Sequence, residues 1–489
     1  MLLFSIIQRC FIRTILRKLS YDNPDLYHNA EIFKVITSLA LKYDIPGIEA
    51  LIIQTIGQEQ LSDVIAHKNP NPYHLMGYAT YGTRRADINS SLLRNISIYD
   101  AFHIGSCAKS MAAILIANAI ESNLFHIQYN TTLRQIFSYL TWSKDNTSTN
   151  GLGLKLDYLS SSEYLLKESF TVDSSWNNVT LAHLLTHTSG IQDESTKETL
   201  WSEIVNIEAK NEVDNNNYLF PSRRYTFGEL LKTPLAKPPS SVNSPSGYMY
   251  SNFGYMIIGL VLEELYSAPY ETIIKRLLFD KLHMNSNSTG FGAPQSDENK
   301  LNPPKQPYGH YRVDNQWVST GEDNPSAITA AGRIHFSGLD WTKYIANHLY
   351  RARDNNANND PIISSSSIYE TLQSPYKFAN ASLASTYTIG GWQSEIHSAY
   401  PGGLLLWHSG SNGYFMSYAF LYPKADVPFA ILVNYNAGSM GDDADREILY
   451  GLNLVYNNRN KSNDGKWTNN DNINYVGTEA LTSTGVVRE

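Results

Sequence analysis

Two long apolar stretches dominate the hydrophobic pattern of this chain. Residues 110–120 (SMAAILIANAI) and 255–265 (YMIIGLVLEEL) are strongly apolar over helical lengths, and such helices are normally enclosed by protein. Nearer the C-terminus, the pattern changes to short segments that are rich in aromatic or branched residues and bounded by turn residues, as antiparallel strands are. These segments are residues 387–392, 404–407, 415–422 and 429–433, and a helix is expected after them at residues 442–454.

The first apolar helix is preceded by Ser-Cys-Ala-Lys at positions 106–109. Residues three apart on a helix are neighbours on one face, so the hydroxyl of Ser106 and the amine of Lys109 are expected within reach of each other. Burial makes the neutral form of a lysine more accessible, and a helix N-terminus favours developing negative charge. The pair therefore predicts a nucleophile with its activator, although an ordinary buried helix start would show the same four residues.

Two further motifs lie at the edges of other apolar segments. A Tyr-Ser-Asn run at 250–252 comes before the second apolar helix, so a phenol and an amide are expected at its entry. A His-Ser-Gly run at 408–410 ends the apolar segment 404–407, where small residues would let a substrate backbone lie alongside a strand. Each motif also has an ordinary structural interpretation, because a lone histidine on a strand is more often simply hydrogen-bonded. The ordinary interpretations do not explain three such motifs in this order.

The ordered motifs resemble those of the serine β-lactamase-related family, which includes class C β-lactamases, D-alanyl-D-alanine carboxypeptidases and related esterases. Between the motifs the similarity continues. Residues 181–191 (LAHLLTHTSGI) and 277–284 (LLFDKLHM) are similar to two further segments of this family. The resemblance covers about residues 28–450, nearly the whole chain except its ends.

The resemblance implies an α+β fold of the β-lactamase/transpeptidase type, with an antiparallel sheet flanked by helices and a mostly helical lobe. One domain would span residues 28–456, and the lobe, about residues 101–385, would be inserted into the α/β portion. That portion would begin with a helix at 29–43 and strands near 47–55 and 74–81. The site would lie in the cleft between the two portions.

The resemblance also implies a role for each motif. Ser106 would attack a carbonyl carbon and form an acyl-enzyme that water then hydrolyses. Either Lys109 or Tyr250 would be the base, and the class C-like branch of the family usually gives this role to the tyrosine. The backbone N–H groups of Ser106 and Ser411 would form the oxyanion hole. The other predicted substrate-binding residues are Asn252, which would bind the substrate amide, and His408, Ser409 and Gly410.

One departure from the family bears on the substrate. Many β-lactamases have lysine where this chain has His408, and an imidazole suits a substrate carboxylate less well than a permanent ammonium. We therefore expect a serine hydrolase that cleaves an amide, ester or lactam bond in a small molecule or peptide, and not specifically a resistance β-lactamase. The alternative is a non-catalytic relative that uses the fold as a scaffold or filament. The retained serine, lysine, tyrosine and asparagine favour catalysis, because a scaffold does not need them.

Other patterns limit the function further. His183 and His187 are four residues apart, but neither a glutamate of the H-E-x-x-H type nor a cysteine accompanies them, so we expect structural hydrogen bonds and no metal. No cofactor is predicted. The formal net charge of -8 and the pI near 5.9 provide no electrostatic reason to bind nucleic acid. Trp392 and Trp407 could line the cleft, but core packing is the favoured interpretation.

The two ends of the chain differ in composition from the rest. Residues 1–27 are apolar and basic, which fits an organelle presequence or a short membrane-associating helix, and fits a secretory signal less well. The pattern leaves the localisation open. The tail at 457–489 is rich in Asn, Asp, Thr and Gly and is expected to be disordered. Cys107 is expected to be a small buried residue and not a reactive thiol.

Overall fold

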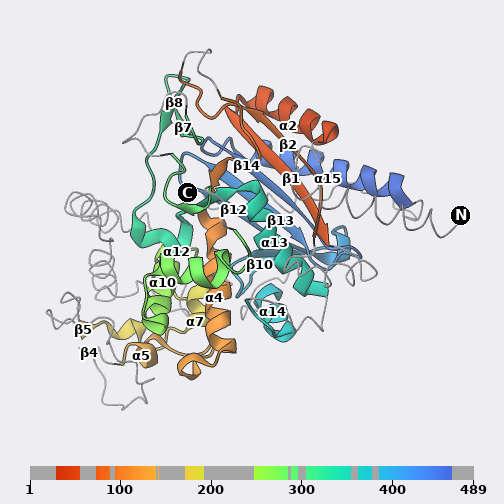
Figure 1. Cartoon of the computed structure of the whole chain (residues 1–489). Helices are drawn as coiled ribbons and strands as arrows, with labels where there is room; N and C mark the ends of the chain where they lie inside the picture. Colours follow the sequence, from red (N-terminus) through yellow and green to blue (C-terminus); the bar gives the residue numbers. More distant parts are fainter. Residues whose placement is uncertain are drawn as a thin grey trace, which may run out of the picture.

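The core of the fold is a seven-stranded antiparallel sheet with strand order β10-β11-β12-β13-β14-β1-β2 (Figure 1). Its strands are β1 (Gly47–Thr55), β2 (Tyr73–Gly82), β10 (Ser385–Tyr387), β11 (Gln393–Ile396), β12 (Leu404–Ser411), β13 (Met416–Tyr422) and β14 (Phe429–Tyr435). The computed structural model describes residues 29–55, 73–88, 94–138, 141–142, 171–191, 247–284, 288–295, 304–353, 362–376 and 385–464.

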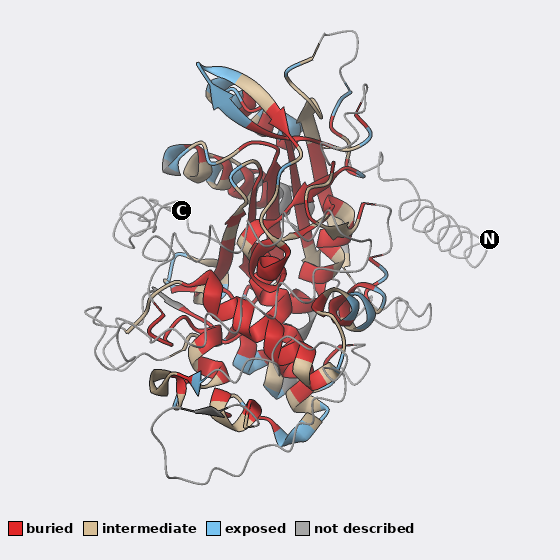
Figure 2. Ribbon diagram, turned by 90° about the vertical axis from the view of Figure 1, so that its left-hand side faces the viewer, coloured by how far each residue is buried: buried red, intermediate tan, exposed pale blue. Residues whose placement is uncertain are grey.

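Helices cover both faces of this sheet, and the alternation of side chains along each strand supplies both cores. On β1, Ile52 belongs to the core beneath α2 (Ala30–Tyr43) and α15 (Asp442–Asp464), whereas Leu51 belongs to the core on the side of α13 (Gly338–Arg353). Because both faces are covered, β13 and β14 are buried at every position. Figure 2 shows that the buried residues continue from the sheet into the central helices.

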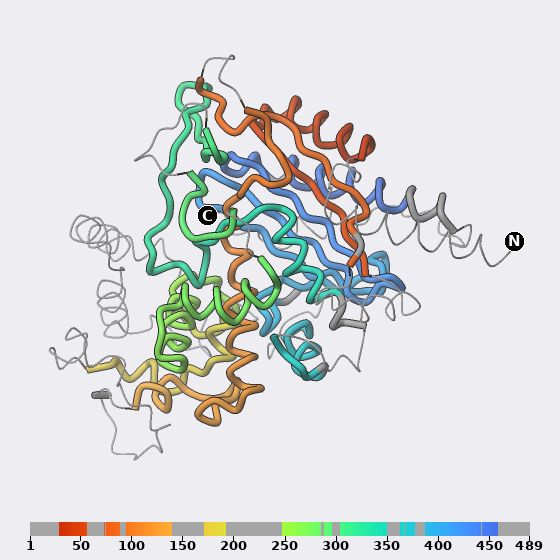
Figure 3. The backbone as a smooth tube through the Cα atoms, viewed as in Figure 1, coloured from red at the N-terminus to blue at the C-terminus, as the bar shows by residue number. Residues whose placement is uncertain are grey.

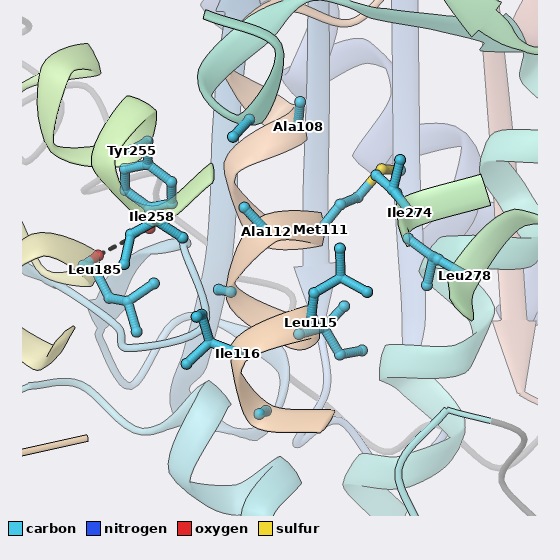
Figure 4. Packing of buried hydrophobic residues seen from close by; sticks show 14 of the residues in the cluster. Ala108, Met111, Ala112, Leu115, Ile116, Leu185, Tyr255, Ile258, Ile274 and Leu278 are labelled. Carbon is cyan, nitrogen blue, oxygen red and sulfur yellow. Dashed lines mark hydrogen bonds between the residues drawn. The ribbon is translucent and has the colours of Figure 1, made fainter. Parts of the chain in front are cut away.

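The early strand β1 pairs with the late strand β14 in the sheet, and helices from the middle of the chain form a lobe against it. Figure 3 shows the red and blue segments side by side in the sheet, and the orange to green segments in the lobe. The lobe centres on α4 (Lys109–Glu121) and α10 (Asn252–Tyr266). Figure 4 shows Leu185 and Ile258 on one side of α4 and Leu278 on the other. The two buried helices predicted from the apolar stretches are thereby confirmed.

In its described residues, the middle of the chain contains short strands as well as helices. It also contains a three-stranded sheet of order β3-β9-β6, and its helix α13 packs against the large sheet. The remaining elements are β3 (Ala101–His103), η3 (Gly105–Ala108), η4 (Leu124–His126), α5 (Leu133–Ile136), β4 (Thr141–Trp142), β5 (Thr171–Val172), η5 (Ser174–Trp176), α7 (Leu181–Leu185), α11 (Tyr270–Ile274), η8 (Lys275–Phe279), β6 (Gly290–Phe291), β7 (Gly309–Val313), β8 (Gln316–Thr320), η10 (Ser326–Ile328), α12 (Thr329–Gly332), β9 (Ile334–Ser337), α14 (Ser366–Gln373) and η11 (Pro401–Gly403).

One predicted strand is wrong. Residues 387–392 do not form a single strand, because β10 ends at Tyr387 and a turn follows before β11. Gly391 has a φ of +76° in this turn, a conformation that disfavours other residues. A Cβ on Gly390 would lie 2.2 Å from the carbonyl oxygen of Leu372, so the turn also requires a close backbone approach.

The closing helix is longer than expected. It was predicted at 442–454, and α15 runs to Asp464, into the segment that was expected to be disordered. The buried Leu452, Val455 and Tyr456 anchor this helix on the sheet. The polar residues that follow include no Gly or Pro to end a helix that is already formed. Residues 465–489 and 1–27 lie outside the described residues. Among the helices that are described, none has both the length and the apolar character to cross a membrane.

Candidate active site

The predicted nucleophile lies in a tight turn where the lobe meets the sheet. Ser106 is half-buried in the 3-10 turn η3, and the α-helix begins only at Lys109. The three-residue spacing still brings the two side chains together, because residues i and i+3 of a 3-10 turn are eclipsed. The Nζ of Lys109 lies 2.9 Å from the Oγ of Ser106.

Lys109 is fully buried and is surrounded by oxygen atoms. Besides Ser106, its Nζ donates to the Oδ1 of Asn252 at 2.5 Å and to the carbonyl oxygen of Ala331 at 2.9 Å. An ammonium group has three N–H donors, and each of these three oxygens can accept one of them. The arrangement therefore suits a lysine that acts as a cationic donor toward the nucleophile.

The ring of Tyr250 also lies close to the lysine amine. The Nζ of Lys109 is 4.7 Å from the centroid of the Tyr250 ring. The ring centroid of His187 is 4.3 Å from that of Tyr250, and the Nδ1 of His187 accepts a hydrogen bond from the backbone N–H of Ser251 at 3.1 Å. His187 thus holds the Tyr-Ser-Asn segment in place. The structure brings Ser106, Lys109 and the Tyr250 ring together, as the sequence predicts.

The end of β12 is in direct backbone contact with η3, the nucleophile turn, so named because it carries the predicted nucleophile Ser106. A Cβ on Gly105, whose φ is +48°, would lie 2.1 Å from the backbone nitrogen of Ser411. A Cβ on Gly410 would lie 2.6 Å from the backbone nitrogen of Ser106. Glycine at both positions is therefore required for the close approach, which puts the amides of Ser106 and Ser411 on adjoining segments.

His408 faces the protein interior. Its side chain is 2% exposed, and its Nε2 lies 3.0 Å from the hydroxyl of Tyr387. Burial, together with the charge of Lys109, lowers the pKa of His408 to about 3. The imidazole is therefore neutral at physiological pH, and its side chain supports Tyr387. A direct contact of this side chain with a substrate stays a prediction, as do the substrate contacts of Asn252, Ser409, Gly410 and Ser411.

The two histidines of residues 181–191 are structural. The four-residue spacing would put both imidazoles on one face of a helix, but α7 ends at Leu185 and His187 has a φ of +58°, so the two do not share a helical face. His183 instead accepts the backbone N–H of Thr180 at the helix N-terminus. Within the described part of the chain, no three His, Cys, Asp or Glu side chains are grouped to hold a metal ion.

The two tryptophans and the cysteine are core residues. Trp392 is fully buried, and Trp407 is buried with its Nε1 donating to Glu395 at 3.0 Å. This agrees with the favoured interpretation of core packing. Burial raises the pKa of the Cys107 thiol, so this residue is a small buried group beside the nucleophile.

Several residues near the site escaped the sequence analysis. Tyr387 and the carbonyl of Ala331 reach the site from distant parts of the chain, and no local motif marks either of them. His103 and Asp323 form a buried pair beside the nucleophile turn, with 3.2 Å between the His103 Nε2 and the Asp323 Oδ1. Of these residues, only His103 could have been noticed from its place in the sequence, because it stands three residues before Ser106.

Comparison with known proteins identifies the family and the fold. The family model described as Beta-lactamase matches residues 100–452. No curated protein sequence matches the chain at a significant level.

Several solved structures are similar to this one. The octameric penicillin-binding protein homologue from Pyrococcus abyssi is 19% identical, with a TM-score of 0.58 over 87% of this chain and 77% of that chain. A class C beta-lactamase is 15% identical, with a TM-score of 0.56 over 87% and 98% of the two chains. The D-stereospecific amidohydrolase from Streptomyces sp. is also 15% identical, with a TM-score of 0.53 over 86% and 97%. At these identities, the structures establish the α+β fold of the β-lactamase type that the sequence predicts.

Proposed function

Because the chain belongs to the beta-lactamase family, we propose that it is a serine hydrolase that cleaves an amide, ester or lactam bond through an acyl-enzyme on Ser106. The observation that carries the proposal is the 2.9 Å contact between the Ser106 Oγ and the Lys109 Nζ, with Asn252 bound to the same amine. The structurally similar class C beta-lactamase and D-stereospecific amidohydrolase are named for hydrolytic activities, which supports a hydrolytic role.

The proposed reaction has two halves. The Ser106 Oγ forms a bond to the carbonyl carbon, and its proton passes to a base in the site. The tetrahedral intermediate then collapses, and its C–O or C–N bond breaks as the leaving group takes up a proton. Water attacks the resulting acyl-enzyme, which releases the acid and restores the hydroxyl of Ser106.

Two groups are candidates for the base. Three oxygens surround the Lys109 amine, which favours its role as a cationic donor. A cation that lies 4.7 Å from the Tyr250 ring would stabilise a phenolate, so this geometry favours Tyr250 as the base. Lys109 is the base in the alternative mechanism, in which its amine is neutral before Ser106 attacks and takes the hydroxyl proton.

The negative charge of the tetrahedral intermediate needs fixed donors. The backbone amides of Ser106 and Ser411 lie on adjoining segments, where Gly105 and Gly410 allow close approach. Amides held in this way stabilise the oxyanion more than the ground-state carbonyl. We propose that these two N–H groups form the oxyanion hole.

The test is covalent labelling of the purified full chain. We expect a fluorophosphonate probe to add one adduct, located on Ser106 by peptide mass spectrometry. Ser106→Ala should abolish the adduct while leaving the melting temperature nearly unchanged, because Ser106 is only half-buried. A folded protein that neither a fluorophosphonate nor a penicillin nor an activated ester acylates would favour the scaffold alternative.

A further inference from the structure

A buried acid lies beside the nucleophile turn without being part of the proposed reaction. Asp323 is in the segment between β8 and η10, and its side chain is 6% exposed. Two side chains converge on its Oδ1. The Nε2 of His103 lies at 3.2 Å, and the Nδ2 of Asn412 donates at 2.9 Å. Asp323 therefore connects β3 with the turn that follows β12.

The first connection leads to the nucleophile. His103 is fully buried at the end of β3, and its Nδ1 accepts the backbone N–H of Gly105 at 3.1 Å. A neutral imidazole that accepts at Nδ1 carries its proton on Nε2, the atom that faces Asp323. Asp323 thus favours the tautomer that holds Gly105, the residue directly before Ser106.

The second connection leads to the other proposed oxyanion donor. Asn412 directly follows Ser411, and its Oδ1 accepts the backbone N–H groups of Tyr414 at 3.1 Å and Phe415 at 2.9 Å. Asn412 thus shapes the turn between β12 and β13. With its Nδ2 held by Asp323, this turn has a defined position relative to β3.

The charge of Asp323 is stabilised where it lies. Burial by itself would raise the pKa of this carboxyl group, but His103, Arg333 and Asn412 outweigh burial and lower it. The Nε of Arg333 also donates to the carbonyl oxygen of Asn324 at 2.8 Å, which holds the loop that carries Asp323. The Oδ1 of this carboxylate accepts the backbone N–H of Asn324 at 2.8 Å and the Nδ2 of Asn412 at 2.9 Å, with the Nε2 of His103 3.2 Å away.

We propose that Asp323 is a positioning residue that sets the spacing of the Ser106 and Ser411 amides through His103 and Asn412. Oxyanion donors are effective only when they are held in place before the reaction. Gly105 and Gly410 contact each other's segments through backbone atoms only, because neither has a side chain. Hydrogen bonds from neighbouring side chains are therefore needed to fix the distance between the two segments. The inference rests on the proposed function, because it assigns Asp323 to the oxyanion hole of that same site.

The experiment compares two alanine variants at buried acids. Asp323→Ala removes the shared acceptor. The matched control is Glu395→Ala, because Glu395 is also buried and accepts two side-chain donors, Tyr400 at 2.6 Å and Trp407 at 3.0 Å. Loss of one oxyanion donor costs about 10²–10³ in kcat, so we expect displaced amides in Asp323→Ala to lower kcat about 10- to 100-fold with KM nearly unchanged. Glu395→Ala should keep the kcat of the natural protein.

A conservative variant separates positioning from a general loss of structure. Asp323→Asn keeps an oxygen acceptor at the same place, so it should recover most of the kcat that Asp323→Ala loses. If Asp323→Ala does not fold, Asn412→Ala tests the second connection at a half-buried position, and it should lower kcat without changing KM.

The outcomes separate this inference from the function itself. No labelling of the natural protein by a fluorophosphonate would count against the proposed function. Labelling of the natural protein, together with equal kcat values in Asp323→Ala and Glu395→Ala, would overturn the positioning role alone. A loss of activity in Asp323→Ala that Asp323→Asn does not recover would also overturn it.

Discussion

The first turn of α4 and its middle turns lie in one buried helix but depend on different physics. In the first turn, Lys109 binds three oxygens, and Ser110 accepts the hydroxyl of Tyr344 at 2.8 Å. In the middle turns, Leu115 and Ile116 are fully buried among apolar neighbours and meet no such requirement (Figure 4). Lys109 and Ser110 need particular atoms at particular distances, whereas Leu115 and Ile116 need only apolar volume around them.

The comparison teaches where activity and stability can be changed separately. A substitution of Lys109 should alter chemistry more than folding, because its amine contacts oxygen atoms and not the apolar core. A substitution in the middle turns should alter folding more than chemistry, since a cavity costs stability wherever it forms.

The largest effect is expected at the amine. Lys109→Met keeps most of the side-chain volume but removes the donor to Ser106 and Asn252. Because activation of the nucleophile is worth about 10²–10⁴ in rate, we expect kcat to fall by about 10³. The free energy of unfolding should change less than in Leu115→Ala, because a buried cation is itself costly. Steady-state kinetics and urea unfolding measure the two quantities, and a variant with near-natural kcat would contradict the proposed role.

A large loss of stability with little change in kcat is expected at Leu115, further along α4. Leu115→Ala deletes a fully buried side chain, and such substitutions cost about 2–5 kcal/mol. The kcat per folded molecule, with the active fraction counted by fluorophosphonate titration, should stay within about twofold of the natural value. A fall in kcat comparable to that of Lys109→Met would mean that the two parts of α4 are not separable.

A smaller change in the free energy of unfolding is expected when the pH is lowered. Burial lowers the pKa of His348 to about 3, and its Nε2 lies 3.0 Å from the Tyr344 hydroxyl that binds Ser110. The unfolded chain takes up this proton near pH 6.5 and the folded chain does not, so this contribution to stability is present above pH 6.5 and is lost as the pH falls toward 3.

A matched variant isolates that contribution. Other groups also titrate in this range, and Glu49, whose pKa burial raises, changes stability in the opposite direction. The natural protein should therefore lose up to about 1.4 kcal/mol more per pH unit than His348→Gln below pH 6.5. Urea unfolding at pH 7 and pH 5 measures the difference, and parallel losses in both proteins would contradict it.

The smallest effect concerns substrate choice. His408 is buried and neutral, so it offers no positive charge to a substrate carboxylate. With two p-nitrophenyl esters whose acyl chains end in a methyl or a carboxylate group, we expect kcat/KM to favour the neutral ester by about tenfold, because the carboxylate would lose water without gaining an ionic partner. The ratio should be the same at pH 6 and pH 8, since His408 does not titrate there. A preference for the carboxylate ester would show that another cation binds it.

The sequence predicted most of the architecture and the meeting of the side chains that we propose react. The buried helices followed from continuous apolar runs, and the meeting of Ser106 and Lys109 followed from a three-residue spacing that survives the change from α-helix to 3-10 turn. Features of this kind depend on neighbours in the chain. The error at 387–392 arose because Gly390 and Gly391 turn the chain against Leu372, a contact that no local pattern reveals.

Which distant groups complete the site was decided only by the tertiary structure. The carbonyl of Ala331, the hydroxyl of Tyr387 and the carboxylate of Asp323 come from segments far from Ser106 in the chain. Periodicity reports which face of an element is buried, but it does not report which polar atoms meet there. That depends on how the lobe packs against the sheet. Packing brings together residues that are far apart in the chain, and their spacing in the sequence does not show which of them will meet.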